Sequence, residues 1–118
     1  MNGWSVGAAL LLATACSSPQ EKAEQAAASA NALAAAGDFE AARKAILRAV
    51  AARDDQPDQW LLLGRVDLET GRPADALLAY SRVLELDATN IEALQLVAEL
   101  SFQFGEMREA ASAADRVL

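Results

Sequence analysis

The chain contains no histidine and only one cysteine among its 118 residues. The lack of histidine removes the side chain that most often serves as a general base and as a metal ligand. A single cysteine cannot form a disulfide within the chain. No serine, cysteine or lysine stands with a plausible base, and no glycine-rich phosphate loop is present. We therefore expect a protein that is not an enzyme and that binds no metal and no cofactor.

Basic and aromatic residues are also scarce. Ten Lys and Arg face 17 Asp and Glu, which gives a net charge of -7, and aromatic residues make up 5% of the chain. Nucleic acids and anionic lipids attract clustered cations, so we do not expect either as an electrostatic partner. Alanine, by contrast, occurs 29 times. This composition favours helices, and the length allows one domain.

The longest apolar run, residues 6–13, is too short to cross a bilayer, because a spanning helix needs roughly 20 apolar residues. Its length fits the core of a signal peptide. The next residues, Ala13–Thr14–Ala15–Cys16, resemble a bacterial lipobox, in which the cysteine receives lipid after cleavage. The match departs from the usual pattern in having Ala13 instead of a larger aliphatic residue, and in lacking Lys or Arg before the core.

The lipobox resemblance implies a signal peptide over residues 1–15 and a lipidated Cys16 that begins a short tether over residues 16–22. Ser17 is not the aspartate that retains lipoproteins in the inner membrane, so the implied location is the outer membrane, facing the periplasm. Two alternatives stay open. The chain is secreted without lipid as a soluble periplasmic protein, or it is not processed and Cys16 keeps its thiol.

A repeat of 34 residues organises the rest of the chain. Four positions of the repeat show this, each recurring every 34 residues. Glycine stands at the first, alanine five residues later, and mostly apolar residues four and seven residues after the alanine. In that order the positions are Gly37, Gly71 and Gly105; Ala42, Ala76 and Ala110; Ile46, Tyr80 and Ala114; Ala49, Val83 and Val117. The glycine allows a turn between two helices, and the alanine lets these helices approach closely. The spacing therefore predicts an all-α chain of about three helix–turn–helix units, over residues 23–56, 57–90 and 91–118, the last incomplete.

Local signals place the first helices. Ser18 and Glu21 have the spacing of a capping box, and Pro19 suits a first helical turn. A helix is therefore expected to begin there and to end near Ala36. Pro57 in turn predicts the start of the second unit.

Residues 57–90 resemble a tetratricopeptide repeat (TPR). The matching positions are Trp60, Leu63, Gly64, Ala76 and Tyr80. Asp67 stands where the family has an aromatic residue, with Leu68 beside it to fill some of that space, and Ala88 replaces a frequent proline. The resemblance implies an α-solenoid that forms a right-handed superhelix, and a shared core formed mainly by Trp60, Leu63, Tyr80, Val83, Leu84 and Leu86.

In TPR proteins the first helix of each unit lines a concave face that binds another polypeptide. Carried over by position, this face contains Glu24, Ala27, Asn31, Ala34, Ala35, Asp58, Leu61, Arg65, Leu68, Glu69, Glu92, Gln95, Glu99, Phe102 and Gln103. Asn31, Arg65 and Glu99 form a polar row in this prediction, beside the apolar Leu61, Leu68 and Phe102. Arg65 either pairs with Glu99 or binds a ligand carboxylate. The family's carboxylate clamp for chaperone tails also needs a lysine in the groove, and none is present, so that ligand is not expected.

Two further groups of residues are candidate binding sites: the aspartates around Pro57 and the apolar positions of the last unit. Asp54, Asp55 and Asp58 cluster around a proline turn, but they lack the spacing of a calcium loop, so we interpret them as solvated turn and cap residues. The last unit has no covering helix over its apolar positions: Met107, Ala110, Ala111, Ala114, Val117 and Leu118. Either this edge meets another protein or a second copy, or the chain belongs to a longer array.

Together these features predict a non-catalytic scaffold, anchored to the outer membrane, that binds a polypeptide partner. The resemblance implies a role in assembling an envelope machine for pili, outer-membrane proteins or exopolysaccharide export. Two alternatives are a structural subunit that associates with itself, and a regulatory module of a cell-wall enzyme.

Overall fold

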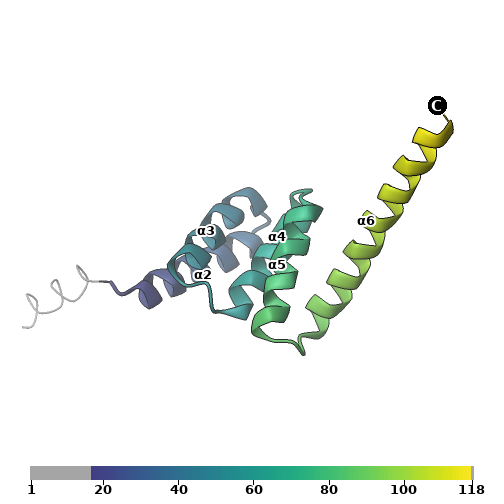
Figure 1. The fold of residues 1–118 in the computed structure, drawn as a ribbon. Helices are drawn as coiled ribbons and strands as arrows, with labels where there is room; N and C mark the ends of the chain where they lie inside the picture. The colour runs from purple at the N-terminus through teal and green to yellow at the C-terminus, as the bar shows by residue number, and fades with distance from the viewer. Residues whose placement is uncertain (1–16, 118) are drawn as a thin grey trace, which may run out of the picture.

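A computed structural model describes residues 17–117, apart from the side chains of residues 113, 114, 116 and 117. Within this range the chain forms helices and no strands, which confirms the all-α prediction (Figure 1). The helices are α2 (Pro19–Ala35), α3 (Phe39–Ala52), α4 (Pro57–Glu69), α5 (Pro73–Leu86) and α6 (Ile91–Val117). The predicted signal peptide, the predicted lipidation site Cys16 and the terminal Leu118 lie outside the described residues.

The start of α2 follows the sequence signals. The Ser18 hydroxyl accepts a hydrogen bond from the Glu21 backbone N–H at 3.1 Å, and the Glu21 carboxylate accepts one from the Ser18 backbone N–H at 3.2 Å. This reciprocal pair satisfies two backbone donors at the helix end. Because α2 begins at Pro19, residues 19–22 are helical and not part of a tether.

The first two units close with the same turn. Gly37 and Gly71 have φ angles of 81° and 72°, which glycine adopts without strain. After Gly37, the Asp38 N–H donates to the Leu33 carbonyl at 2.9 Å, and after Gly71 the Arg72 N–H donates to the Asp67 carbonyl at 2.7 Å. These bonds are those of a Schellman motif, so the predicted turns at Gly37 and Gly71 are confirmed.

The predicted third turn is wrong. Gly105 lies inside α6, which continues as one helix to Val117, so the third unit has no second helix within the described residues. The residues after each glycine explain the difference. Asp38 caps α3 after Gly37, and Pro73 starts α5 soon after Gly71, whereas Glu106 and Met107 after Gly105 are good helix formers. A single glycine costs a helix only about 1 kcal/mol relative to alanine, which does not stop it.

Helices that follow one another in the chain pack side by side, α2 on α3, α3 on α4, α4 on α5 and α5 on α6. The helices α2 to α5 form a compact body, and the second half of α6 extends away from it (Figure 1). This arrangement is that of a helical-repeat solenoid with two complete hairpins and one single helix.

Two clusters of buried apolar residues hold the solenoid together. The first joins α2, α3 and α4 around Ile46 and includes Ala79 of α5. The second joins α5 and α6 around Tyr80 and Val83, and residues of α4 pack against it. Trp60 contacts both clusters. Of the predicted core residues, Leu63, Tyr80 and Val83 are buried, while Trp60, Leu84 and Leu86 are half-buried.

Candidate functional site

A cleft of about 340 Å³ lies between α2 and α4. Its lining includes five of the positions carried over from the TPR groove: Ala27, Asn31, Asp58, Leu61 and Arg65. Asn31 is exposed, and its side-chain amide donates to the Ala27 carbonyl one turn earlier, at 2.9 Å. The structure therefore brings these five predicted groove residues into one hollow, although their role in binding stays a prediction.

Arg65 is the one cation among the described residues that line this cleft, and it is already paired. Its guanidinium donates two hydrogen bonds to the Glu92 carboxylate, at 2.8 Å and 2.7 Å. The alternative in which Arg65 pairs with Glu99 is wrong, because Arg65 pairs with Glu92 at the start of α6 instead. The bidentate geometry fixes the orientation of both side chains and links α4 to α6.

The groove positions further along do not line the cleft. Gln95, Glu99 and Phe102 are exposed on α6, and Phe102 is 67% exposed. Leu68 is half-buried against the second core cluster, and Leu61 contacts that cluster as well as the cleft. The predicted row of Asn31, Arg65 and Glu99 is thus split between the cleft and the free surface of α6.

Gln59 is a cleft residue that sequence reasoning missed. Its side chain is only 8% exposed, and its Oε1 has no hydrogen-bond partner among the residues that the structure describes. It also lines a small adjoining cleft of about 60 Å³ beside Glu24 and Arg53. An unused acceptor of this kind costs free energy unless a ligand or a water satisfies it. The repeat pattern does not assign a role to glutamine at this position, so only the burial of Gln59 in the structure identifies it.

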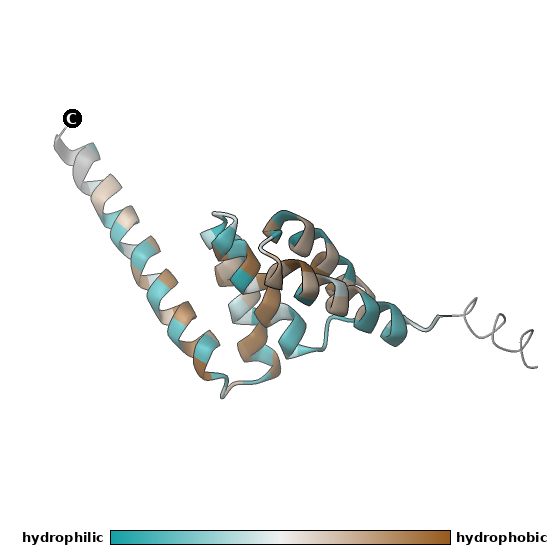
Figure 2. Ribbon diagram, turned by 180° about the vertical axis from the view of Figure 1, so that it is seen from behind, coloured by the Kyte–Doolittle hydropathy of each residue, from teal (hydrophilic) through white to brown (hydrophobic). Residues whose placement is uncertain are grey.

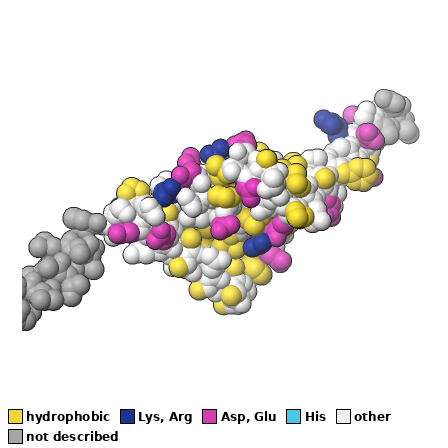
Figure 3. All heavy atoms as spheres, turned by 90° about the horizontal axis from the view of Figure 1, so that it is seen from below, with side chains coloured by type: hydrophobic (Ala, Val, Ile, Leu, Met, Phe, Trp, Pro, Cys, Tyr) yellow, Lys and Arg dark blue, Asp and Glu magenta, His cyan; other side chains and the backbone are white. Residues whose placement is uncertain are grey.

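Acidic side chains dominate the predicted groove surface. Glu24, Asp58, Glu69, Glu92 and Glu99 carry negative charge there, and Arg65 alone is positive. Figure 3 shows acidic side chains scattered over the face seen from below, with few basic ones among them. The surface is therefore suited to neutral or basic ligands.

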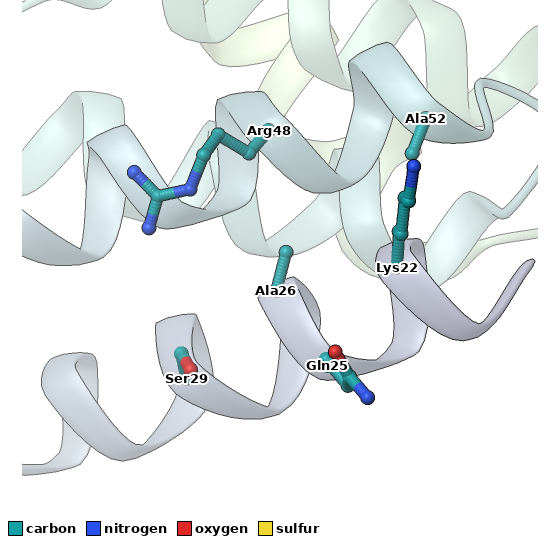
Figure 4. Close-up of a pocket in the computed structure, with 6 residues that line it drawn as sticks. All are labelled: Lys22, Gln25, Ala26, Ser29, Arg48 and Ala52. Atoms are coloured by element: carbon teal, nitrogen blue, oxygen red, sulfur yellow. The ribbon is translucent and has the colours of Figure 1, made fainter. Parts of the chain in front are cut away.

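A larger cleft, of about 430 Å³, lies between α2 and α3 (Figure 4). Figure 4 shows Lys22 reaching from α2 towards Ala52 on α3, with Arg48 on α3 and Ser29 on α2 further along. Lys22, Arg48 and Ser29 are all exposed. Solvent and salt therefore weaken the attraction of both cations for an anion, so this open surface is a weak anion site.

A third cleft, of about 410 Å³, separates α3 from α5 and has an ion pair at its edge. Asp67 is 1% exposed and accepts a hydrogen bond from the Arg43 Nε at 2.6 Å. Arg43 also lies 3.5 Å from the Asp75 carboxylate. Asp67, which stands where the TPR pattern has an aromatic residue, thus forms an ion pair between the two hairpins.

The aspartates near Pro57 have structural partners. Asp55 accepts hydrogen bonds from the Arg53 guanidinium at 3.0 Å and 2.7 Å. The backbone carbonyl of Asp54 accepts a hydrogen bond from the Trp60 indole at 2.7 Å. These contacts position the connection between α3 and α4.

Comparison with known proteins adds evidence for the fold. No protein-family model and no curated protein matches the chain. Among solved structures, it is similar to the first TPR of Spaghetti (RPAP3) bound to the HSP90 peptide SRMEEVD, with a TM-score of 0.66 and 23% identity. The match covers 70% of this chain and 66% of that chain, just under two thirds of its length.

The chain has the fold of a TPR domain. The expected α-solenoid architecture is therefore confirmed. Within residues 17–117, no helix combines the length and the apolar character that crossing a lipid bilayer requires.

Proposed function

We propose that this TPR chain is a non-catalytic interaction module that binds an extended segment of another polypeptide on the face formed by α2, α4 and the first half of α6. The observation that carries this proposal is the single cleft that collects Asn31, Asp58, Leu61 and Arg65 from two successive units. The similar TPR structure, which is bound to a peptide, supports the same use of the fold.

The chemistry of the cleft favours a peptide unlike the acidic SRMEEVD of that structure. Arg65 is paired with Glu92, whose charge offsets its own, so a ligand carboxylate meets no unpaired cation in this cleft. Glu99 makes no ion pair among the described residues, and the Phe102 ring beside it is 67% exposed. We expect the ligand to carry Lys or Arg for these carboxylates and an apolar side chain for Phe102 and Leu61.

Fluorescence anisotropy with labelled peptides tests this proposal. The probes are two peptides of equal length, one alternating Lys and Leu and the other alternating Glu and Leu, together with SRMEEVD. The basic peptide is expected to bind at least about tenfold more tightly than either acidic one, which corresponds to about 1.4 kcal/mol.

Phe102→Ala is expected to weaken binding of the basic peptide about tenfold, because burying an aromatic side chain contributes about 1.5–3 kcal/mol. Leu78→Ala on α5 is the matched control, since Leu78 is 70% exposed and lies away from this face. Equal losses in the two variants, or equal binding of basic and acidic peptides, would contradict the proposal.

We further propose that the chain is a lipoprotein anchored through Cys16 to the outer membrane, where it serves an envelope assembly machine. The Ala13–Thr14–Ala15–Cys16 sequence supports lipidation, and Ser17 in place of aspartate supports the outer-membrane location. The start of α2 at Pro19 is in keeping with a short link between this anchor and the domain. Mass spectrometry of the mature protein is expected to show loss of residues 1–15 and acyl chains on Cys16. A mature chain that keeps Met1 and a free thiol would rule the anchor out while leaving the peptide-binding proposal untouched.

A further inference from the structure

Gln59 is a buried polar residue in a mostly apolar contact between helices. Figure 2 shows hydrophobic residues gathered in the middle of the body formed by α2 to α5, with hydrophilic residues mostly towards its edges. Gln59, in the first turn of α4, is nonetheless only 8% exposed, and neither its Oε1 nor its Nε2 has a hydrogen-bond partner among the described residues. Nearly all buried polar groups in folded proteins have a protein, water or ligand partner, because an unused one costs free energy. The partner of this amide therefore comes from outside the described part of the chain.

Two clefts adjoin at Gln59. It lines the cleft of about 340 Å³ between α2 and α4, and it also lines the smaller one of about 60 Å³. Since no hydrogen bond among the described residues holds its amide, a rotation about the Cγ–Cδ bond exchanges the oxygen and the nitrogen at little cost. The oxygen can therefore turn towards a ligand in either cleft.

The polar groups beside Gln59 in the larger cleft are mainly acceptors as well. The Asp58 carboxylate is exposed and forms no ion pair among the described residues. The Asn31 amide nitrogen donates to a backbone carbonyl of its own helix at 2.9 Å, which leaves its Oδ1 to accept from a ligand. Arg65 is the exception, and Glu92 offsets its charge. The cleft therefore suits a ligand group that is positively charged and has several donors.

The smaller cleft adds a second carboxylate and has room for a water-sized group. Its lining includes Glu24, whose Oε1 accepts a hydrogen bond from the Gln20 side chain at 3.0 Å. Arg53 lines it too, but its guanidinium donates to Asp55 at 3.0 Å and 2.7 Å. Both clefts thus favour a compact cation, and a lysine ammonium, with three donors on one small group, fits this description better than the larger planar guanidinium.

We infer that the cleft at Gln59 is a subsite for a lysine side chain of the bound peptide, and that Gln59 selects the unmodified ammonium by accepting one of its hydrogen bonds. The aliphatic stem of the lysine lies against Ala27 and Leu61, and its ammonium reaches Gln59 and Asp58. This inference rests on the proposed peptide binding, and it adds which residue recognises the cation. Gln59 is not among the positions that the TPR resemblance assigns to the groove.

Two peptides that differ only in their hydrogen-bond donors test this subsite. One is the peptide of alternating Lys and Leu. The other carries trimethyl-lysine at every Lys, which keeps the positive charge but has no N–H to donate. Fluorescence anisotropy with the full chain measures both dissociation constants. We expect the unmodified peptide to bind about tenfold more tightly, because a hydrogen bond that involves a charged group contributes about that factor.

Gln59→Met should reduce this preference to about threefold or less, because methionine keeps the volume of the side chain but lacks the amide oxygen. The substitution removes a polar group that has no partner among the described residues, so the fold is retained. Any general defect would weaken both peptides alike and leave their ratio unchanged. Gln25→Met is the matched control. Gln25 is exposed on α2 and lines the cleft towards α3, so the preference should stay about tenfold.

The proposed peptide binding and this subsite fail in different ways. Equal binding of the basic and acidic peptides overturns the peptide binding and, with it, the subsite. If the basic peptide is preferred but its unmodified and trimethylated forms bind equally, only the subsite is overturned. The same holds if Gln59→Met leaves the preference unchanged, because a water and not the ligand then satisfies Gln59.

Discussion

Tyr80 is the largest fully buried side chain among the described residues, and its neighbours explain two features of the sequence. It is 1% exposed, and its ring occupies the space that a Cβ at Gly64 would need. Gly64 is therefore required by the close approach of Tyr80 and not by its own backbone angles, since its φ is not positive. The glycine of the Leu63–Gly64 pair and the aromatic residue Tyr80 in the repeat pattern thus reflect one contact, that between α4 and α5.

Burial of Tyr80 predicts a specific loss of stability in alkali. Burial, and then the negative charge of Glu92, raises the pKa of Tyr80 to about 12. The unfolded chain loses the phenolic proton near pH 10, whereas the folded chain holds it, so stability falls as pH rises from 10 to 12. The free energy of unfolding should drop by about 2–3 kcal/mol over this range. Urea unfolding at several pH values measures it.

The Tyr80→Phe variant is the control for this pH effect, because it keeps the ring but has no proton to lose. The free energy of unfolding of this variant should fall less steeply between pH 10 and 12 than that of the unmodified chain. Parallel curves for the two proteins between pH 10 and 12 would show that the Tyr80 phenol titrates normally in the folded state.

Asp67 shows how a charged residue replaces an aromatic one between the two hairpins. Its carboxylate is 1% exposed and is hydrogen-bonded to Arg43 of the preceding hairpin. Burial raises the pKa of the Asp67 carboxyl, while the hydrogen bond from Arg43 opposes that rise. The buried Asp67 carboxylate therefore depends on Arg43 to stay ionised in the interior.

Removing Arg43 is expected to be strongly destabilising at neutral pH. In Arg43→Ala the Asp67 carboxylate stays buried without its partner, and unfolding should become easier by about 3 kcal/mol. Since the pKa of Asp67 rises further, the defect should shrink as pH falls and the carboxyl is protonated. Thermal unfolding between pH 4 and 7 measures this trend. Adding Asp67→Asn should abolish the pH dependence of the defect, and its persistence would show that another group causes it.

At the scale of the elements, the contrast between α6 and the two hairpins depends on what surrounds each glycine. Gly71 has a φ of 72°, a conformation that a residue with a side chain adopts only with strain. Gly105 is helical, and a Cβ there would meet no atom within 4 Å. The same residue type at the same repeat phase thus has opposite structural roles.

The variants Gly105→Ala and Gly71→Ala should therefore act in opposite directions. Gly105→Ala should stabilise α6 by up to about 1 kcal/mol and raise the helical signal in circular dichroism. Gly71→Ala should destabilise the second hairpin by about 1–2 kcal/mol, because alanine is strained at a positive φ. If both variants lowered the melting temperature equally, Gly105 would form a turn in solution.

For the molecule as a whole, Trp60 connects the two halves of the solenoid. Its side chain contacts both buried clusters, and its indole N–H donates to the Asp54 carbonyl at 2.7 Å. Each repeat contacts only its neighbours, so the coupling between units decides whether the chain unfolds in one step. Trp60 therefore supports cooperativity as well as stability.

Trp60→Ala should lower the free energy of unfolding by about 3 kcal/mol and make the urea transition less steep, as the two clusters begin to unfold separately. Leu78→Ala, which removes a side chain that is 70% exposed, should change stability by less than about 0.5 kcal/mol. A steep transition in Trp60→Ala would show that the remaining contacts between units, such as Ala79 in the first cluster, suffice for coupling.

The sequence by itself determined the helices α2 to α5, the first two turns and the spacing of the core. Ser18 with Glu21, Gly37 with Asp38 and Gly71 with Pro73 act on backbone groups only a few residues away, so their effect is readable locally. The TPR resemblance also predicted that Ala27, Asn31, Asp58, Leu61 and Arg65 share one face, and these five residues line one cleft. Their role in binding stays a prediction.

Only the tertiary structure decided the contacts between units and the course of the third one. Arg43 with Asp67 and Arg65 with Glu92 join residues 24 and 27 positions apart, and several other carboxylates were equally plausible partners from sequence. Gly105 keeps the repeat phase, yet a turn there also needs a capping residue and a packed second helix. Glu106 and Met107 favour a continuous helix, which the repeat pattern alone does not predict.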